Sequence, residues 1–310
     1  MAQPSSALKE LARALEAHKA WLEGQEAGAR LDLSSSNLAG IDLKGRDLRM
    51  ALIKSSSLTG ASLEGSILTG AVLTNVDLHE ARLIEADLTG AELKDVNFEH
   101  SDLSEASFSE VTAATCLFGG ANLSGTRFLD AHLNVCNFTK AVLKATVLQH
   151  ARLFDCEFAE ANMEGALFNH ARIRLCRFKE VRGAAAVFSY SGIENSDFRK
   201  AQLNEAKFVK ANISGGTFGW AMLASADFRE STLRGTEFSG AMLHGARFGS
   251  ATLNGADFRG ANLNGAKELT SQQMTKAWTG RDTILPNGQR GVYLKGSGAE
   301  RPSRSSLQTV

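Results

Sequence analysis

The most regular feature of this sequence is an apolar residue that recurs at every fifth position from Leu33 to Leu263. This large position holds Leu, Ile, Met or Phe in 45 of 47 repeats, and the exceptions are Ala113 and Gly183. A small residue, most often Ala, precedes it by two places, and a mostly polar residue lies between them. A period of five fits neither a helix nor a plain strand, so the repeat itself must determine the architecture.

The two apolar positions of each unit lie two residues apart, as on one face of a strand, so we expect both to point inward. The other residues, often Gly, Ser, Thr, Glu or Lys, must turn the chain before the next unit begins. Such a chain wraps into short extended sides joined by tight corners, and it buries its apolar face only when coil stacks on coil. The pattern predicts an all-β solenoid over residues 31–266.

The inward residues indicate how many units make one coil. Phe recurs every ten residues from Phe98 to Phe258, with Leu148 as the one interruption. Four units per coil would stack Phe on Phe, whereas three would stack Phe on Leu. The four cysteines all occupy the small inward position at intervals of twenty, namely Cys116, Cys136, Cys156 and Cys176. We therefore expect four sides per coil, and we interpret the cysteines as buried small apolar residues rather than disulfides or metal ligands.

The units also resemble a known family. Residues 61–65 read Ala-Ser-Leu-Glu-Gly, residues 86–90 read Ala-Asp-Leu-Thr-Gly, and residues 261–265 read Ala-Asn-Leu-Asn-Gly. They are similar to the A(D/N)LXX signature of pentapeptide repeat proteins, and the resemblance covers about three quarters of the chain. It implies a right-handed quadrilateral β-helix of about twelve coils. With stacked strands about 4.8 Å apart, the rod would be on the order of 55 Å long.

The segments that flank the repeat predict short helical caps at both ends. Residues 1–30 would form an N-terminal cap, with an amphipathic helix over 5–23 that starts at Ser5 or Ser6 and packs His18 rather than binding a ligand with it. Residues 267–295 would form the C-terminal cap, with a short helix over 270–278 begun by a capping box. Gly, Ser, Pro and Arg dominate residues 296–310, and disorder is expected there.

Composition argues against an enzyme and against a membrane protein. The chain has no apolar run of 18 residues and no basic-then-apolar leader. Reduced cysteines suit the cytoplasm, although a leaderless bacterial secretion route would also fit. The carboxylates and histidines are scattered over outward positions of a convex rod. We expect no catalytic residues, no bound metal and no cofactor.

Charge is balanced overall, with 34 basic and 34 acidic residues, but it is unevenly distributed. An acidic cluster is followed by a basic one, and both are candidate charged patches: Asp77, Glu80, Glu85, Asp87 and Glu92, then Arg172, Arg174, Arg177, Lys179 and Arg182. Ordinary solvated faces would explain both clusters equally well. Some pentapeptide repeat proteins mimic duplex DNA and bind type II topoisomerases such as gyrase. A mimic needs acid along most of its length, so the basic second half argues against this reading.

One side of the coil carries no charge over three successive rungs. Its candidate partner-binding residues are Val147 and His150, then Leu167 and His170, then Val187 and Tyr190. An apolar and aromatic centre bounded by charge is typical of an interface. The leading hypothesis is a non-enzymatic scaffold that offers the faces of a rigid rod to a protein partner, and a second copy of this chain is one candidate. A bacterial secretion-associated effector is an alternative, while specific nucleic-acid binding is not expected because the basic run spans several sides.

Overall fold

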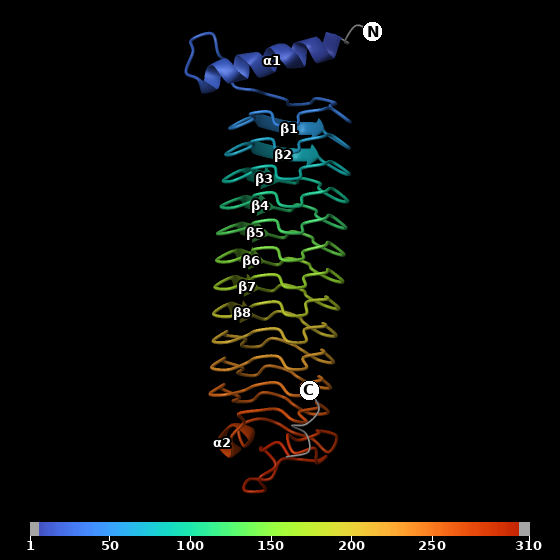
Figure 1. Cartoon of the computed structure of the whole chain (residues 1–310), viewed down its shortest axis with the longest axis vertical. Helices are drawn as coiled ribbons and strands as arrows, with labels where there is room; N and C mark the ends of the chain where they lie inside the picture. The colour runs from blue at the N-terminus through green and yellow to red at the C-terminus, as the bar shows by residue number, and fades with distance from the viewer. Residues whose placement is uncertain (1–5, 304–310) are drawn as a thin grey trace.

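The computed structural model describes residues 6–303, whose chain winds into a long stack of parallel coils with a helix across one end (Figure 1). The named elements are α1 (Ser6–Leu22), β1 (Leu52–Ser57), β2 (Val72–Asp77), β3 (Glu92–Lys94), β4 (Thr112–Ala114), β5 (His132–Asn134), β6 (Arg152–Phe154), β7 (Arg172–Arg174), β8 (Gly192–Glu194) and α2 (Ser271–Met274). The strands form one sheet in chain order, and every neighbouring pair is parallel. This arrangement confirms an all-β parallel solenoid.

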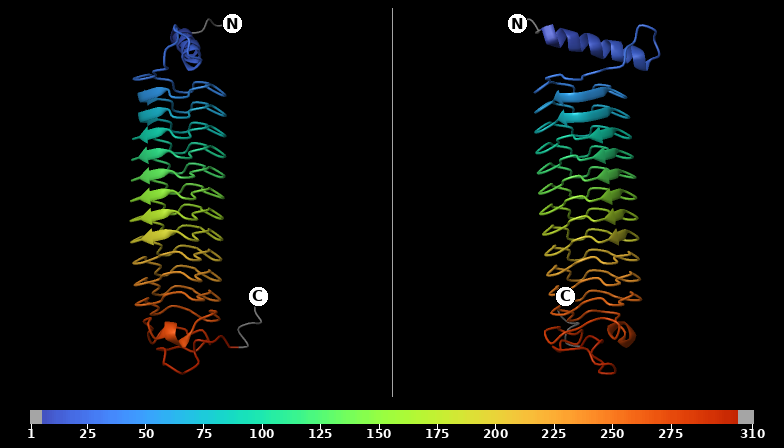
Figure 2. Two further views of the ribbon diagram at one scale, coloured as in Figure 1. Left: turned by 90° about the vertical axis from the view of Figure 1, so that its left-hand side faces the viewer. Right: turned by 180° about the vertical axis from the view of Figure 1, so that it is seen from behind.

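Each coil contains twenty residues, which corresponds to four five-residue units. Leu52 pairs with Val72, and the same offset of twenty continues in isolated bridges as far as Arg247 and Lys267. The pairing of β1 to β8 accounts for about seven turns, and the coils continue beyond β8 with bridges alone (Figure 2). The predicted spacing of the Phe and Cys columns is therefore correct.

Backbone hydrogen bonding explains why a five-residue unit repeats so well. The Phe168 N–H donates to the Val187 carbonyl of the next coil (2.7 Å), and the Leu167 N–H donates to the Thr146 carbonyl of the previous one (2.9 Å). The Ala171 N–H then closes a turn onto the Phe168 carbonyl (3.1 Å). The corner between these units is His170, whose φ of 59° lies in the left-handed region. Buried backbone groups are thus satisfied by the coils on either side.

The core consists of columns of similar apolar side chains, and the Phe columns are the most regular. Phe138 stacks on Phe158 with ring centroids 4.7 Å apart and planes 4° from parallel. The neighbouring Phe column meets it edge to face, as Phe168 does with Phe178 at 6.0 Å and 85°. The cysteine column is buried and unpaired, and the Cys156 thiol donates to the Leu133 carbonyl (3.5 Å). Stacked and edge-to-face pairs are the two favoured aromatic geometries, so both columns support each other.

Ala113 and Gly183, the two small residues at the large core position, do not interrupt the coil. The register through Ala113 is continuous from Leu93 to Leu133. A Cβ atom placed on Gly183 would lie 2.9 Å from Leu203 Cδ2 and 3.1 Å from a methylene of Met163. Flexible side chains of the adjacent coils, rather than phenylalanines, therefore fill this space.

The N-terminal helix α1 covers the first coil, as the sequence predicts. Leu11, Ala14 and Leu15 pack against the core. His18 is fully buried, and its Nδ1 accepts a hydrogen bond from the Leu31 N–H (3.0 Å) where the coil begins. The helix ends before Gly24, whose φ is 75°. A predicted helix start at Ser5 lies outside the described residues, and among the described residues no helix is long and apolar enough to cross a membrane.

The C-terminal end differs from the prediction in two ways. The helix α2 has the predicted capping box of Thr270 and Gln273, but it ends at Met274 instead of Trp278, because Trp278 pairs with Asp257 and continues the coil. The disorder predicted for residues 296–310 does not hold for residues 296–303. Ala299 is buried there, and Glu300 accepts a hydrogen bond from the Tyr293 hydroxyl (2.9 Å). Residues 304–310 lie outside the described part of the chain.

Candidate functional site

The aromatic residues of the predicted binding face form a continuous ladder along one corner of the rod. His150, His170 and Tyr190 occupy equivalent corner positions, with φ between 59° and 62°. The ring centroids of His150 and His170 are 5.0 Å apart at 7°, and those of His170 and Tyr190 are 4.9 Å apart at 12°. Lys210 Nζ lies 5.4 Å from the Tyr190 ring and ends the ladder. Tyr190 is 50% exposed, so the ladder offers ring surface to solvent.

A column of aliphatic side chains runs beside this ladder. Val147 pairs with Leu167, which pairs in turn with Val187, and all three are half-buried. The column is continued by Arg127 at one end and by Lys207 at the other. The structure therefore brings all six predicted residues onto one face. We call this face, made of Val147, His150, Leu167, His170, Val187 and Tyr190, the ring face.

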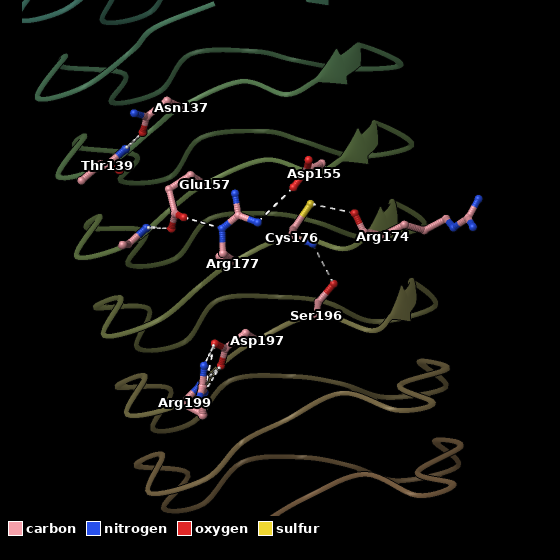
Figure 3. Close-up of polar contacts among 11 residues, drawn as sticks. Asn137, Thr139, Asp155, Glu157, Arg174, Cys176, Arg177, Ser196, Asp197 and Arg199 are labelled. Atoms are coloured by element: carbon pink, nitrogen blue, oxygen red, sulfur yellow. Dashed lines mark hydrogen bonds and ion pairs between the residues drawn. The ribbon is translucent and has the colours of Figure 1, made fainter. Parts of the chain in front are cut away.

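The predicted basic cluster is divided among several sides, and three of its five members are ion-paired. Arg177 lies against Glu157 (2.6 Å) and Asp155 (3.0 Å), as Figure 3 shows, and hydrogen bonding to Glu157 raises the pKa of this guanidinium. Arg174 pairs with Glu194 at 3.2 Å. Lys179 pairs with Glu180 at 3.7 Å. Arg182 lies on another side of the coil, where its backbone forms β-bridges with Asn162 and Gln202. The five residues do not form one positive surface.

Arg172, the remaining member, lies beside a residue outside the predicted cluster. It is paired in register with Arg152 on the neighbouring strand, and both side chains are exposed. Neither arginine makes an ion pair with any residue in the described part of the chain. The two arginines follow His150 and His170 by two residues each, so they flank the ring face across its corner.

The predicted acidic cluster is partly used in holding the coil together. Asp77 accepts hydrogen bonds from the His79 N–H (3.1 Å) and the Thr59 hydroxyl (2.9 Å). Burial opposes ionisation of Asp87, but hydrogen bonds from Thr89 outweigh it and lower the pKa of that carboxyl. The remaining members lie at outward positions: Glu80, 3.5 Å from His79, together with the exposed Glu85 and Glu92. Asp77 and Asp87 thus act as turn-forming acceptors.

Sequence reasoning missed a second uncharged surface near the C-terminal end. Trp220 is 70% exposed at a corner, and Met222 and Met242 are exposed and paired on successive coils. A Cβ atom on Gly240 would meet the Trp220 ring at 2.8 Å, so the indole lies over bare backbone. The sequence contains the signal for this surface, because Trp220, Met222 and Met242 are apolar residues at outward positions.

No metal or catalytic centre emerges from the residues that the structure describes. Within 6–303 no group of three or more His, Cys, Asp and Glu is arranged to hold a metal ion. The hollow lined by Lys140, Glu160, Glu180, Arg182 and Lys200 is a surface groove, in which Lys140 pairs with Glu160 and Lys200 pairs with Glu180.

Several solved structures resemble this one. HetL from the cyanobacterium Nostoc sp. strain PCC 7120, a pentapeptide repeat protein involved in heterocyst differentiation regulation, is 22% identical, and the match covers 88% of this chain and 96% of HetL with a TM-score of 0.25. Full-length QnrB1, a plasmid-mediated fluoroquinolone resistance protein, is 19% identical over 62% of this chain and 89% of its own, with a TM-score of 0.29. A pentapeptide repeat protein from the Arabidopsis thaliana thylakoid lumen is 24% identical over 39% of this chain and 70% of its own, with a TM-score of 0.16.

Family models identify the repeat directly, whereas no curated protein matches the chain significantly. The model of a pentapeptide repeat region matches residues 151–228. The model of pentapeptide repeats, which spans eight copies, matches residues 56–95, 116–153, 217–249 and 243–267. Together these ranges cover more than half of the sequence. The chain belongs to the pentapeptide repeat family.

Proposed function

We propose that this protein is a non-enzymatic scaffold whose ring face binds a protein partner. The observation that carries the proposal is the stacked ladder of His150, His170 and Tyr190 beside half-buried Val and Leu side chains. Aromatic residues are enriched and charges depleted at the centre of protein interfaces, whereas the rim is polar. Arg127 and Lys207 supply such a rim at the two ends of the aliphatic column.

Rigidity supports a role in recognition. Every coil is held by hydrogen bonds to both neighbours, so the ring face is already organised before a partner arrives. Preorganised side chains lose little conformational entropy on binding. A solenoid also exposes a large surface and encloses little cavity, which is why repeat proteins commonly act by binding other proteins.

We infer further that the rod is a right-handed quadrilateral β-helix of about twelve coils over residues 31–266, capped by residues 1–30 and 267–295. The constant offset of twenty residues between bridged positions supports four sides and this coil count. A cytoplasmic location remains our proposal, supported by four unpaired buried cysteines. The topoisomerase and secretion alternatives remain untested predictions, and the turn-forming role of Asp77 and Asp87 gives no support to DNA mimicry.

Leu167→Asp tests the ring face. Asp is native at the equivalent outward position of two other coils, in Asp87 and Asp227, so the change should not strain the chain. We expect unchanged circular dichroism and a nearly unchanged melting temperature, together with loss of self-association in sedimentation or of partner capture in quantitative pull-downs. The cause would be a charge placed at the apolar centre of the interface.

Val142→Asp is the matched control. Val142 occupies the equivalent outward position on another side and bridges only to Asn122 and Asn162, so the new carboxylate meets no like charge. The control should associate as the wild type does. Equal association of wild type, control and Leu167→Asp would show that the ring face is ordinary surface.

A further inference from the structure

Many charged side chains on this rod have a partner of opposite charge one coil away. Pairs of opposite charge twenty residues apart are Lys44–Glu64, Lys140–Glu160, Lys144–Glu164, Glu157–Arg177, Arg174–Glu194, Glu180–Lys200 and Lys210–Glu230. Because positions twenty apart lie on neighbouring coils, such pairs satisfy charge within the molecule. Arg152 and Arg172 instead place two like charges at paired positions. Like charges are also bridged at Arg247–Lys267 and Glu237–Asp257, but there Arg247 pairs with Glu268 and Asp257 pairs with Arg259.

The two arginines have no counter-charge among the described residues. Neighbouring strands are separated by about 4.8 Å, so their side chains project side by side. Like charges directly opposite on paired strands are destabilising. Beyond them the same column holds His132 on β5 and Gly192 on β8, neither of which supplies an acid. The fold therefore maintains two adjacent cations that nothing described in the molecule neutralises.

Apolar surface lies directly beside these cations. Phe154, the next outward residue on β6, is 42% exposed, and the Arg174 guanidinium lies 6.0 Å from its ring centroid. Leu175, at the following corner, is also exposed. Arg174 is already paired with Glu194, so it holds the phenyl ring while Arg152 and Arg172 remain available. We call Arg152, Phe154, Arg172, Arg174 and Leu175 the arginine face.

We propose that the arginine face binds an acidic segment of a protein, with carboxylates bridging Arg152 and Arg172 and an apolar side chain against Phe154 and Leu175. This inference rests on the proposed function, because the segment belongs to the partner that the adjacent ring face contacts. A guanidinium matches a carboxylate with two parallel hydrogen bonds. Arginine and aromatic residues also supply a large share of the binding energy at interfaces. The arrangement thus specifies both the charge and the apolar character of the partner.

A nucleic acid fits this surface less well than an acidic protein segment. Electrostatic affinity for a nucleic acid grows with the number of phosphates neutralised. Two unpaired cations on adjacent strands can neutralise about two phosphates, and Arg174 beside them is already paired with Glu194. Phe154 and Leu175 would contribute most to a partner that carries apolar side chains as well as acids.

The experiment measures binding of three fluorescein-labelled probes by anisotropy at physiological ionic strength. The probes are a peptide in which Asp and Glu alternate with Phe and Leu, the same peptide with Lys in place of its acids, and a single-stranded oligonucleotide. The full chain is compared with Arg152→Gln/Arg172→Gln. Arg234→Gln/Arg281→Gln is the control, because it removes the same charge from two exposed arginines elsewhere.

We expect the acidic peptide to bind the wild type and the control alike, and to bind the Arg152→Gln/Arg172→Gln variant at least about tenfold more weakly. That variant should melt no lower than the wild type, because it loses a like-charge contact. Equal binding of the acidic and basic peptides, or unchanged binding to the variant, would overturn the inference. Tighter binding of the oligonucleotide through the same arginines would overturn it in favour of a nucleic acid.

Leu167→Asp separates this inference from the proposed function. If Leu167→Asp abolishes association but the acidic peptide shows no arginine-dependent binding, the ring-face proposal is supported and the acidic-segment proposal is refuted. If the peptide binds through the two arginines but Leu167→Asp leaves association unchanged, the ring-face proposal is refuted and the acidic-segment proposal is supported.

Discussion

Leu167 and Phe168 are neighbours in the sequence but belong to two different regions of the coil. Phe168 is fully buried and stacks on Phe188 with ring centroids 4.7 Å apart. Leu167 lies outside the wall, between Val147 and Val187 on the ring face. The interior accepts few residue types because each column must match the coils above and below. The exterior accepts almost any residue, so a departure from its usual polar character carries information about binding.

The first test of this difference is the truncation of a buried core side chain. Phe168→Ala should cost about 3–5 kcal/mol of unfolding free energy, because the vacated ring leaves a cavity between Leu148 and Phe188 in the same column. Urea unfolding followed by circular dichroism measures the effect, and Phe198→Ala should behave alike. A loss below about 1 kcal/mol at both positions would contradict the stacked core.

A smaller effect on stability, which depends on pH, is expected at the N-terminal cap, where α1 covers the first coil. Burial lowers the pKa of His18, although the Arg49 backbone and Asp47 oppose this shift. The unfolded chain therefore binds this proton more readily, so the stabilising contribution is complete above the unfolded pKa of 6.5 and is lost as pH falls. Protonated Nδ1 can no longer accept from the Leu31 N–H, and an unpaired buried amide costs about 1–3 kcal/mol.

Amide exchange at Leu31 and fluorescence of Trp21, which stacks on His18 at 5.6 Å, report this opening of the cap. Between pH 7 and 5 both signals should change in the wild type. His18→Gln keeps an acceptor without titrating, and its signals should stay constant. Identical pH profiles in the two proteins would assign the change to other groups.

The interior was predictable from sequence, and the exterior only in part. A strict period of five fixes which residues point inward, so the Phe and Cys columns followed from spacing alone. The Glu157–Arg177 pair and the Arg152–Arg172 contact each join residues twenty positions apart, so they could also have been predicted from the repeat. Proximity in sequence instead groups Arg172 with Arg177. Those two side chains are close in sequence and lie on different sides of the coil.

The ends of the rod were the least predictable parts because their contacts obey no period. Trp278 leaves the expected helix to pair with Asp257, at an offset of 21 residues instead of 20. The Tyr293 hydroxyl donates to Glu300 within a segment whose composition favours disorder. Such contacts depend on one long-range partner each, and neither propensity nor composition contains that information.

The smallest expected effect is the reaction of the native protein with a thiol reagent, because the four cysteines lie inside the coil. All four thiols are buried, and Cys136 and Cys156 each donate to a backbone carbonyl of the previous coil. Hydrogen bonding to Cys136 and burial raise the pKa of the Cys116 thiol, which keeps that sulfur in its unreactive neutral form. Native protein should therefore give almost no reaction with an aromatic disulfide reagent, while protein in denaturant should react at four sites. Asn134→Cys, at an exposed position two residues before Cys136, should react at once and shows that the reagent reaches the wall of the rod. Rapid reaction of the native wild type at Cys136 would place this column outside the wall and would reverse the assignment of interior and exterior.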